Sequence, residues 1–270
     1  MSNRLSSLLL VIPNSYKYMT LFNFDNAKTK KGNHLGYSTA ILYLAPSDMS
    51  GVVNVCQNAT KECRELCLVY AGLAGIFPKI NESRIKKTKW MHEFPSAFWA
   101  KVDREILNHE NLCYRNTKRL KRKLKPCVRI NGTSDIWNTD MQTIMYRHPD
   151  VQFYDYTKSV TRCIDWKQGK LPMNYHLTFS YGGGDTHNAL WCLNNGVNVA
   201  VVFDTKRGKE LPPHLWGFDI IDGDTHDLRF LNKVEGKYGR IIGLRGKGKA
   251  VGVVGKQKGF VQSGSMEVQS

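Results

Sequence analysis

The sequence predicts an α/β fold in which most strands are parallel. Short β-rich runs alternate with helical stretches along most of the chain, and polar residues stand directly after most of these runs. Such alternation is typical of parallel strands joined by helices, and polar residues are expected at the carboxyl ends of those strands, where parallel sheets bind ligands. A hydrophobic content of 41% with 11% aromatic residues excludes a disordered chain.

Seven β-rich runs predict strands. The first, residues 37–44, reads Y-S-T-A-I-L-Y-L and ends at Ala45-Pro46. A loop with three cysteines follows it. The later strands are expected at residues 127–131, 151–156, 175–180, 197–203, 218–221 and 240–244.

Five helices are expected between these strands, at residues 81–91, 95–108, 140–147, 160–166 and 186–195. In the second, Ser96 can cap the helix, and Phe98, Val102 and Ile106 recur every four residues on one face. Gly196 marks the end of the last helix. We see no repeats and no low-complexity linker, so we expect one domain at residues 23–262, an extension at 1–22 and a tail at 263–270.

The chain carries a net charge of +16, from 39 Lys and Arg against 23 Asp and Glu. Such a bias favours contact with phosphate backbones or anionic surfaces. Residues 114–129 and 233–258 each hold eight Lys or Arg, and glycines in the second stretch let backbone amides approach phosphate. A solvated surface is the alternative interpretation. The predicted nucleic-acid-binding residues are Arg119, Lys121, Arg122, Lys123, Arg245, Lys247 and Lys249.

No membrane segment is expected, because the apolar run at residues 8–13 is too short to cross a bilayer and lacks a signal-peptide cleavage site. Cys127, Cys163 and Cys192 stand alone in apolar surroundings and are expected to be core thiols. Reduced thiols predict a cytoplasmic protein.

Cys56, Cys63 and Cys67 form the pattern C-x6-C-x3-C. Grouped thiolates select Zn²⁺ or an iron–sulfur cluster, and nearby basic residues favour the thiolate form. Three cysteines are enough for an iron–sulfur cluster in which one position is not bound by cysteine. A structural Zn²⁺ normally needs four protein ligands. The candidates for a fourth zinc ligand are His92, Cys113 and Cys127. Both metals remain open.

The polar residues after the later strands are the other candidates for chemistry. Asp135, Asp155 and Lys158 are the predicted catalytic residues, although each aspartate could instead cap the helix that follows it. Asp222 and Asp224 could contact a metal or a ribose, or form an ordinary turn. The glycine run at residues 182–184 is either a phosphate-binding loop or a permissive turn.

Several blocks of the chain resemble the phage-encoded gene product 88 family over about residues 23–260. The blocks, besides the cysteine loop, are residues 26–29 (N-A-K-T), 83–88 (S-R-I-K-K-T), 129–137 (R-I-N-G-T-S-D-I-W), 153–158 (F-Y-D-Y-T-K), 174–180 (N-Y-H-L-T-F-S) and 222–230. More distantly, the cysteine loop after the first strand resembles that of radical S-adenosylmethionine enzymes. Those enzymes usually show C-x3-C-x2-C with an aromatic residue before the last cysteine, where this chain has Leu66.

The distant resemblance implies a partial (β/α) barrel with the cysteine-rich loop after its first strand. It also implies a [4Fe–4S] cluster on the three cysteines, with S-adenosylmethionine at the open iron. Thr133, Ser134 and Asp135 would then hold the methionine amino group, and Ser180 would meet the ribose. Asp222 and Asp224 complete the set of predicted cofactor-binding residues.

The predicted function is therefore that of a radical S-adenosylmethionine-like iron–sulfur enzyme acting on nucleic acid or a nucleotide in the host cytoplasm. The alternative is a nucleic-acid-binding protein with a structural Zn²⁺, extending to a Mg²⁺-dependent nuclease. In that alternative, paired carboxylates, Asp135 with Asp155 or Asp222 with Asp224, would hold Mg²⁺ for attack on a phosphodiester.

Overall fold

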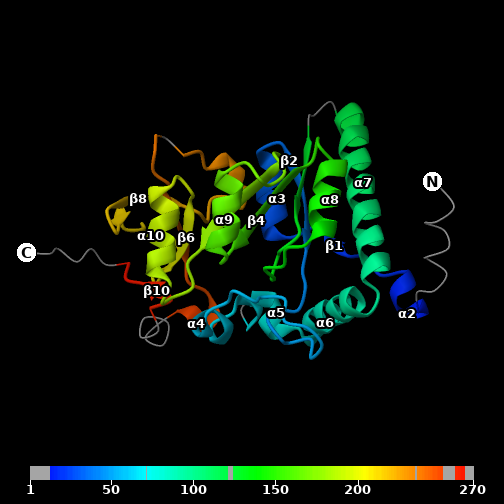
Figure 1. Ribbon diagram of the computed structural model, residues 1–270, viewed down its shortest axis with the longest axis horizontal. Coiled ribbons are helices and arrows are strands. Elements are labelled where there is room, and N and C mark those ends of the chain that lie inside the picture. The colour runs from blue at the N-terminus through cyan, green and yellow to red at the C-terminus, as the bar shows by residue number, and fades with distance from the viewer. Residues whose placement is uncertain (1–12, 71, 121–123, 235, 252–258, 265–270) are drawn as a thin grey trace, which may run out of the picture. The chain divides into compact units, whose positions relative to one another are not determined.

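The computed structural model describes residues 13–70, 72–120, 124–234, 236–251 and 259–264 (Figure 1). Ten strands form an open, mostly parallel sheet in the order β1-β2-β3-β4-β5-β6-β9-β8-β7, with β10 paired to β6. The strands are β1 (Phe22–Asn23), β2 (Tyr37–Leu42), β3 (Lys125–Arg129), β4 (Gln152–Thr157), β5 (Tyr175–Ser180), β6 (Val199–Phe203), β7 (His214–Leu215), β8 (Phe218–Asp222), β9 (Ile241–Arg245) and β10 (Val261–Gln262). The predicted α/β class with mainly parallel strands is confirmed.

The α-helices within the described ranges are α2 (Asn14–Lys17), α3 (Ala27–His34), α4 (Lys61–Glu65), α5 (Gly72–Ile76), α6 (Pro78–Glu93), α7 (Pro95–Leu120), α8 (Thr139–Arg147), α9 (Val160–Lys167) and α10 (Thr186–Asn194). Short 3₁₀ helices are η2 (Leu68–Tyr70), η3 (Arg229–Leu231) and η4 (Gly248–Ala250). No helix in this part of the chain is both long enough and apolar enough to span a membrane.

All seven predicted strands and all five predicted helices are present. Strand β5 has the predicted bounds, and each of the other elements differs from its predicted bounds at one end or both. The largest difference is α7, which was expected to stop near Asn108 and instead continues to Leu120. The prediction that Ser96 caps this helix is wrong, because α7 begins at Pro95 and places Ser96 inside the first turn. Proline suits a first helical position because its φ is preset and its missing N–H would have had no intrahelical partner. Gly196 follows α10 with φ of 72°, as expected of a helix stop.

The chain folds into two compact units. Unit 1 comprises Met1–Cys56 and Lys79–Phe153, and unit 2 comprises Gln57–Pro78 and Tyr154–Ser270. The single domain expected at residues 23–262 stays a prediction.

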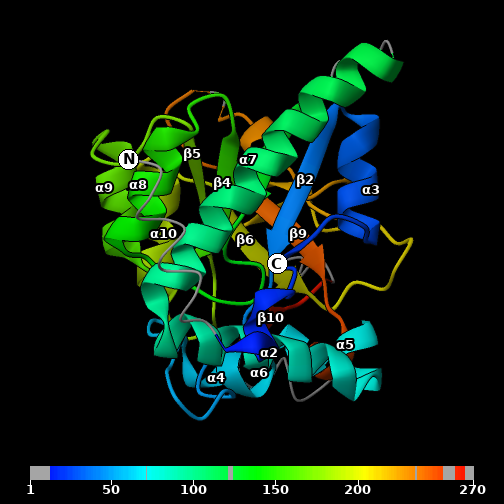
Figure 2. The same cartoon turned by 90° about the vertical axis from the view of Figure 1, so that its right-hand side faces the viewer.

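In unit 1, β2 is antiparallel to β1 and parallel to β3, with Tyr37 opposite Lys125 and Ile41 opposite Arg129. Helix α3 lies along β2, and α7 packs beside β2, β3 and α8 (Figure 2). Phe98, Val102 and Ile106 of α7 are fully buried, so the predicted apolar face of this helix is confirmed. Burial of three such side chains contributes several kcal/mol to the stability of the unit, about 1.5–3 kcal/mol for each.

A buried histidine ties the end of α8 to α7. His148 Nδ1 lies 3.0 Å from Glu110 Oε2, and His148 Nε2 lies 3.1 Å from Asp103 Oδ1. Arg147 donates to the second oxygen of Asp103 at 3.1 Å. Burial lowers the pKa of His148, but the hydrogen bonds and charges of Asp103 and Glu110 outweigh it and leave this pKa raised above 6.5.

We expect His148→Gln to destabilise the protein by about 1.5 kcal/mol near pH 6, as for other hydrogen bonds to charged groups. The folded pKa is the higher one, so the stabilisation is complete below the unfolded pKa and is lost as the pH rises through the folded pKa. Urea unfolding should therefore show a difference in the free energy of unfolding between variant and wild type that is smaller at pH 9 than at pH 6.

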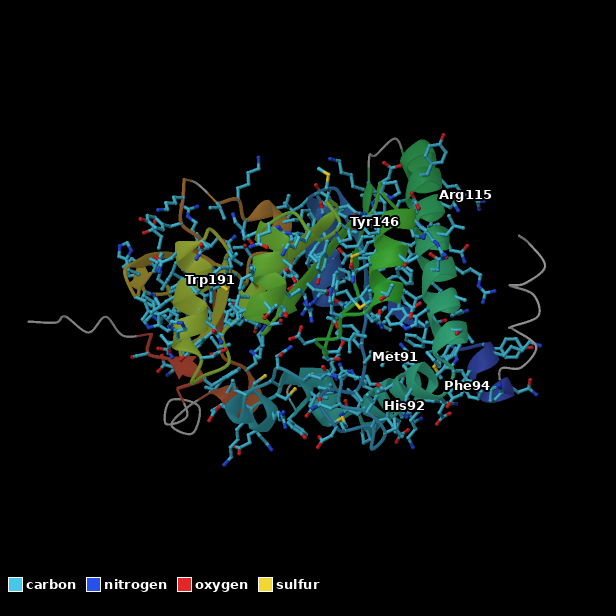
Figure 3. The ribbon with its side chains drawn as sticks, viewed as in Figure 1. Met91, His92, Phe94, Arg115, Tyr146 and Trp191 are labelled. Carbon is cyan, nitrogen blue, oxygen red and sulfur yellow. The ribbon has the colours of Figure 1, made fainter. Side chains whose placement is uncertain are left out.

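The matched control for this experiment is His92→Gln. His92 is exposed near the end of α6, next to Met91 and Phe94 (Figure 3). It lies away from the end of α8, where Figure 3 labels Tyr146. An equal pH-dependent gap for both histidine variants would contradict the role given to His148.

In unit 2, β6 is parallel to β5, β9 and β10, and β9 is parallel to β8. Helices α9 and α10 pack against β5 and against each other (Figure 1). A small apolar cluster is made by Leu66, Ala250, Phe260 and Val261, with Cys63 packed against it. This cluster joins the segment that carries the second and third loop cysteines to β10.

The cysteines divide by burial. Cys127, Cys163 and Cys192 are buried, which confirms the expectation of core thiols, and Cys113 on α7 is buried too. Cys56, Cys63 and Cys67 are each only partly buried. The loop cysteines are therefore the ones within reach of a ligand.

Candidate functional site

The loop after β3 is held by one amide side chain. Asn131 is 1% exposed, and its Oδ1 accepts hydrogen bonds from Ser134 Oγ at 2.8 Å and from the Ile136 N–H at 2.9 Å. Thr133 Oγ1 donates to the Leu44 carbonyl at 2.6 Å. Both hydroxyl protons are already used in these hydrogen bonds. Thr133 and Ser134 can therefore offer a ligand only the acceptor lone pairs of their hydroxyl oxygens. Acceptors suit an amino group, so their predicted role is chemically compatible.

The first loop cysteine lies against this turn. Cys56 Sγ is 3.8 Å from the Thr133 carbonyl oxygen, and the Cys56 N–H donates to Asn54 Oδ1 at 2.8 Å. The Asp135 N–H donates to the Val55 carbonyl at 2.8 Å. In unit 1 the cysteine loop therefore begins at the carboxyl end of β3.

The second cysteine is positioned by a helix cap in unit 2. Thr60 precedes α4, and its Oγ1 accepts from the Cys63 N–H at 3.1 Å while donating to the Gly182 carbonyl at 2.7 Å. A Cβ on Gly182 would lie 3.0 Å from Thr60 Oγ1 and 3.1 Å from Lys158 Nζ. The glycine run after β5 thus accommodates the cysteine helix closely. The capping role of Thr60 was not predicted, although threonine before a short helix is the usual signal.

Lys158 and Asp185 lie at the same strand end. Lys158 Nζ donates to the Ser180 carbonyl at 2.7 Å and contacts Ser180 Oγ at 3.2 Å. Asp185 Oδ1 accepts from the Gly182 N–H at 3.1 Å. Burial raises the pKa of Asp185 and outweighs the lowering by that N–H and by the Lys158 charge. A carboxyl group with a raised pKa beside an ammonium group can take part in proton transfer.

Asp185 was not among the predicted site residues. An aspartate that follows a glycine run and precedes a helix is most simply interpreted as a cap, but Asp185 makes no side-chain cap hydrogen bond to α10. Only its burial and its neighbours distinguish it.

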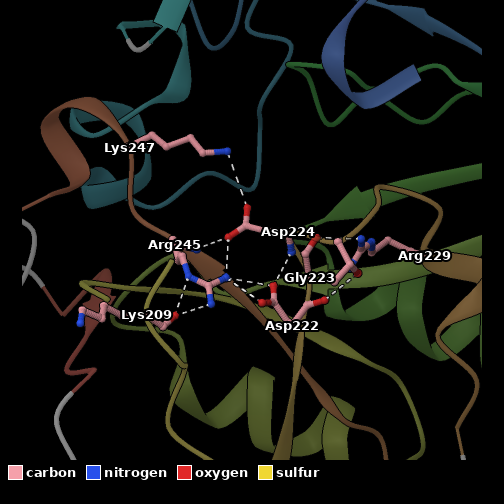
Figure 4. A network of polar contacts seen from close by, with 8 residues as sticks. Lys209, Asp222, Gly223, Asp224, Arg229, Arg245 and Lys247 are labelled. Carbon is pink, nitrogen blue, oxygen red and sulfur yellow. Dashed lines mark hydrogen bonds and ion pairs between the residues drawn. The ribbon is translucent and has the colours of Figure 1, made fainter. Parts of the chain in front are cut away.

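Asp222 and Asp224 lie in a polar network at the end of β8 (Figure 4). Arg245 Nη1 contacts Asp222 Oδ2 at 2.9 Å and Asp224 Oδ2 at 3.2 Å, and the guanidinium also donates to the Lys209 carbonyl. Lys247 Nζ is 3.7 Å from Asp224. Burial raises the pKa of Asp224, but its hydrogen bonds with Arg245 outweigh this and leave the pKa lowered. Arg245 therefore pairs with both carboxylates, and Arg245 and Lys247 together balance their charge.

The family model of Gene product 88 matches residues 20–263. The chain belongs to the Gene product 88 family. No curated protein and no solved structure matches the chain. The matched region spans all ten strands and the cysteine loop of this Gene product 88 protein, so the resemblance to the phage family is confirmed. The link to radical S-adenosylmethionine enzymes stays a prediction.

The remaining predicted site residues of the Gene product 88 chain are placed as follows. Asp155 is 1% exposed and accepts from the Tyr175 hydroxyl at 3.3 Å. Asp135 belongs to unit 1 and Asp155 to unit 2, so their pairing stays a prediction. Lys249 Nζ lies 4.7 Å from the centre of the Tyr70 ring. The Arg119 side chain and Lys121, Arg122 and Lys123 lie outside the described residues.

Among the described residues of this Gene product 88 protein, no group of three or more His, Cys, Asp and Glu side chains is arranged to hold a metal ion. By donor type, three partly buried thiols fit an iron–sulfur cluster with one open position. Cluster and zinc both stay predictions.

Proposed function

We propose that this Gene product 88 protein is an iron–sulfur enzyme of the radical S-adenosylmethionine type, acting on nucleic acid or a nucleotide in the host cytoplasm. One observation carries the proposal: the cysteine loop is anchored at strand ends within each unit. Cys56 lies against Thr133 after β3, and Thr60 joins the Cys63 helix to Gly182 after β5. Parallel α/β sheets bind ligands at these carboxyl ends.

The strand order supports a partial barrel as the finer description of the fold. Strands β2, β3, β4, β5 and β6 are neighbours in the order in which they occur in the chain. A (β/α) barrel keeps this sequential order, whereas a doubly wound sheet reverses it at a switch point. The departure after β6, where β9 is the next strand, would mark the end of the barrel-like part.

In this proposal Cys56, Cys63 and Cys67 hold the cluster, which when bound supplies an electron for cleavage of the S-adenosylmethionine sulfonium. Thr133 and Ser134 offer hydroxyl lone pairs to the methionine amino group, and Asp135 offers a carboxylate. Ser180, whose Oγ lies 3.2 Å from Lys158 Nζ, would meet the ribose. The net charge of +16 supports a phosphate-bearing substrate.

Asp185 is the group that we assign to proton transfer. At neutral pH a carboxyl group with a raised pKa keeps a larger protonated fraction than an ordinary aspartate. Its Oδ1 is oriented by the Gly182 N–H, and Lys158 lies close enough for its charge to act on the carboxylate. Lys158 and Asp185 therefore form the acid–base pair of the proposed site.

The test is anaerobic reconstitution with iron and sulfide, followed by iron and sulfide analysis, absorption and electron paramagnetic resonance. Wild type should become brown and bind about four irons per chain, as expected for one [4Fe–4S] cluster. Cys56→Ala, Cys63→Ala and Cys67→Ala should each lose most of that iron and still fold, because these thiols are only partly buried.

Cys192→Ala is the matched control, since Cys192 is a buried thiol on α10 and should keep the full iron content. A colourless wild-type protein with stoichiometric zinc would overturn the cluster and favour the zinc-containing nucleic-acid-binding protein. In that case Cys56→Ala should unfold the protein. The associated nuclease could not use Asp222 and Asp224 for Mg²⁺ until both had released Arg245.

A further inference from the structure

A second site is indicated by a buried cation in unit 2. Arg229 in η3 is completely buried, and its Nη2 donates to the Gly223 carbonyl at 3.0 Å (Figure 4). Within the described chain, its Nε and Nη1 have no hydrogen-bond partner. Burying a guanidinium whose N–H groups are not all satisfied is strongly unfavourable. Arg245, by contrast, is neutralised by two carboxylates.

The segment around Arg229 covers one face of β4. The Tyr154 and Tyr156 hydroxyls contact the Asp227 carboxylate at 3.5 and 3.3 Å. The ring of Phe230 packs edge-on against Tyr154 with centroids 5.5 Å apart. Tyr154 and Tyr156 are two residues apart on a strand, so they share a face, and residues 227–230 lie over that face.

The neighbouring strand β5 presents two more unsatisfied groups on the same face. The Tyr175 hydroxyl bonds to Asp155, which places Tyr175 on the opposite face from Tyr154. His176 and Thr178 therefore lie on the same face of the sheet as Tyr154, and η3 packs against β5. His176 Nε2 and Thr178 Oγ1 are buried and, within the described chain, have no hydrogen-bond partner.

The polar groups at this place are not fully hydrogen-bonded within the described chain. Burial lowers the pKa of His176 to about 4, and the charge of Arg229 lowers it further, so the imidazole is neutral at physiological pH. Asp227, the nearest acid along the chain, is engaged by the two tyrosine hydroxyls. The Arg229 guanidinium, the Thr178 hydroxyl and the neutral His176 imidazole therefore all have unused hydrogen-bonding capacity within the described chain.

We propose that Arg229, His176 and Thr178 form a buried binding site for one small oxyanion, the phosphate or carboxylate group of a ligand. Guanidinium groups bind both anions through charge-assisted hydrogen bonds, and the Thr178 hydroxyl and a neutral imidazole N–H can donate alongside. The anion neutralises Arg229 and satisfies the three side chains at once. This site uses none of the loop cysteines and does not depend on the proposed function.

The experiment is a thermal-melting and calorimetric titration of the purified full chain, without iron reconstitution, with sodium phosphate or sodium acetate at constant ionic strength. Wild type should show a saturable rise in melting temperature with at least one anion, since a ligand that binds only the folded state stabilises it. Saturation by phosphate identifies a phosphate group, and saturation by acetate alone identifies a carboxylate.

Arg229→Gln should abolish the saturable response, whereas Arg207→Gln, at an exposed position after β6, should leave it unchanged. Thr178→Val keeps the side-chain shape and should weaken the anion affinity about tenfold through loss of one hydrogen bond. This variant decides the question if Arg229→Gln fails to fold.

Two results would overturn the site. One is an anion response of equal size in wild type and Thr178→Val, and in Arg229→Gln where that variant folds, which indicates a general salt effect. The other is no saturable response in wild type while Arg229→Met melts at a higher temperature, which indicates that water alone solvates the buried cation.

Discussion

Gly132→Ala should destabilise unit 1 by about 3 kcal/mol, at the upper end of overpacking changes. A Cβ at this position would lie 2.6 Å from the Leu42 carbonyl oxygen, 2.7 Å from Tyr43 Cδ1 and 2.8 Å from Ile41 Cγ2. The loop cannot withdraw without loss, because the Gly132 N–H donates to that same carbonyl at 2.9 Å. Urea unfolding at pH 7, followed by fluorescence and by circular dichroism, measures the change.

Gly208→Ala is the control for this substitution. Nothing lies within 4 Å of a Cβ at Gly208, and only its φ of 82° opposes alanine, at a cost of about 1–2 kcal/mol. If Gly132→Ala were no more destabilising than this control, the close packing of the β3 loop against β2 would be incorrect. The same variant should also disturb the position of Thr133 beside Cys56.

Arg245→Met should destabilise unit 2 by about 2 kcal/mol, between the values of exposed and buried ion pairs. The Arg245 side chain is only 12% exposed, while Asp222 and Asp224 are 41% and 26% exposed. Without the guanidinium, two carboxylates remain close together and the Lys209 carbonyl loses its donor. Urea unfolding at pH 7 measures the change.

The ion pair of Arg245 with Asp224 also predicts that the free energy of unfolding depends on pH. The folded pKa of Asp224 is lowered, so its stabilisation is present above the unfolded pKa and is lost as the pH falls through the folded pKa. The difference in the free energy of unfolding between Arg245→Met and wild type should therefore become smaller in acid. Adding Asp222→Asn and Asp224→Asn to Arg245→Met should recover part of the stability at pH 7.

Lys247→Met is the matched control, because Lys247 is 62% exposed and its Nζ lies 3.7 Å from Asp224. This substitution should lower the free energy of unfolding by less than about 0.5 kcal/mol. Equal losses for Arg245→Met and Lys247→Met would show that the network does not stabilise the fold.

The elements of the fold follow closely from local sequence patterns. Strand β5 occupies residues 175–180 as predicted, because its β-rich run is bounded on both sides by turn-forming residues. The end of α7 was misplaced because the apolar periodicity fades before the basic residues that follow Asn108. Lys and Arg are good helix formers, so the helix continues without that signal.

The candidate site was predicted in its residue types more than in its contacts. Polar residues at the ends of β3, β5 and β8 were expected, and the structure places Thr133, Ser180 and Asp222 there. Partners distant in sequence were not predicted: Thr60 for Gly182, and Arg245 for Asp222. Strand order brings these residues together, and no local pattern records strand order.

By itself the sequence determined the α/β class, the seven main strands, the family and the three loop cysteines, because periodicity, residue type and spacing are local properties of a chain. Only the tertiary structure decided that Arg245 pairs with two predicted ligand carboxylates and that the pKa of Asp185 is raised. It also decided that two nitrogens of the buried Arg229 guanidinium have no hydrogen-bond partner among the described residues. Burial and charge pairing depend on which segments meet across the sheet, and they set the free energy of each ionised group.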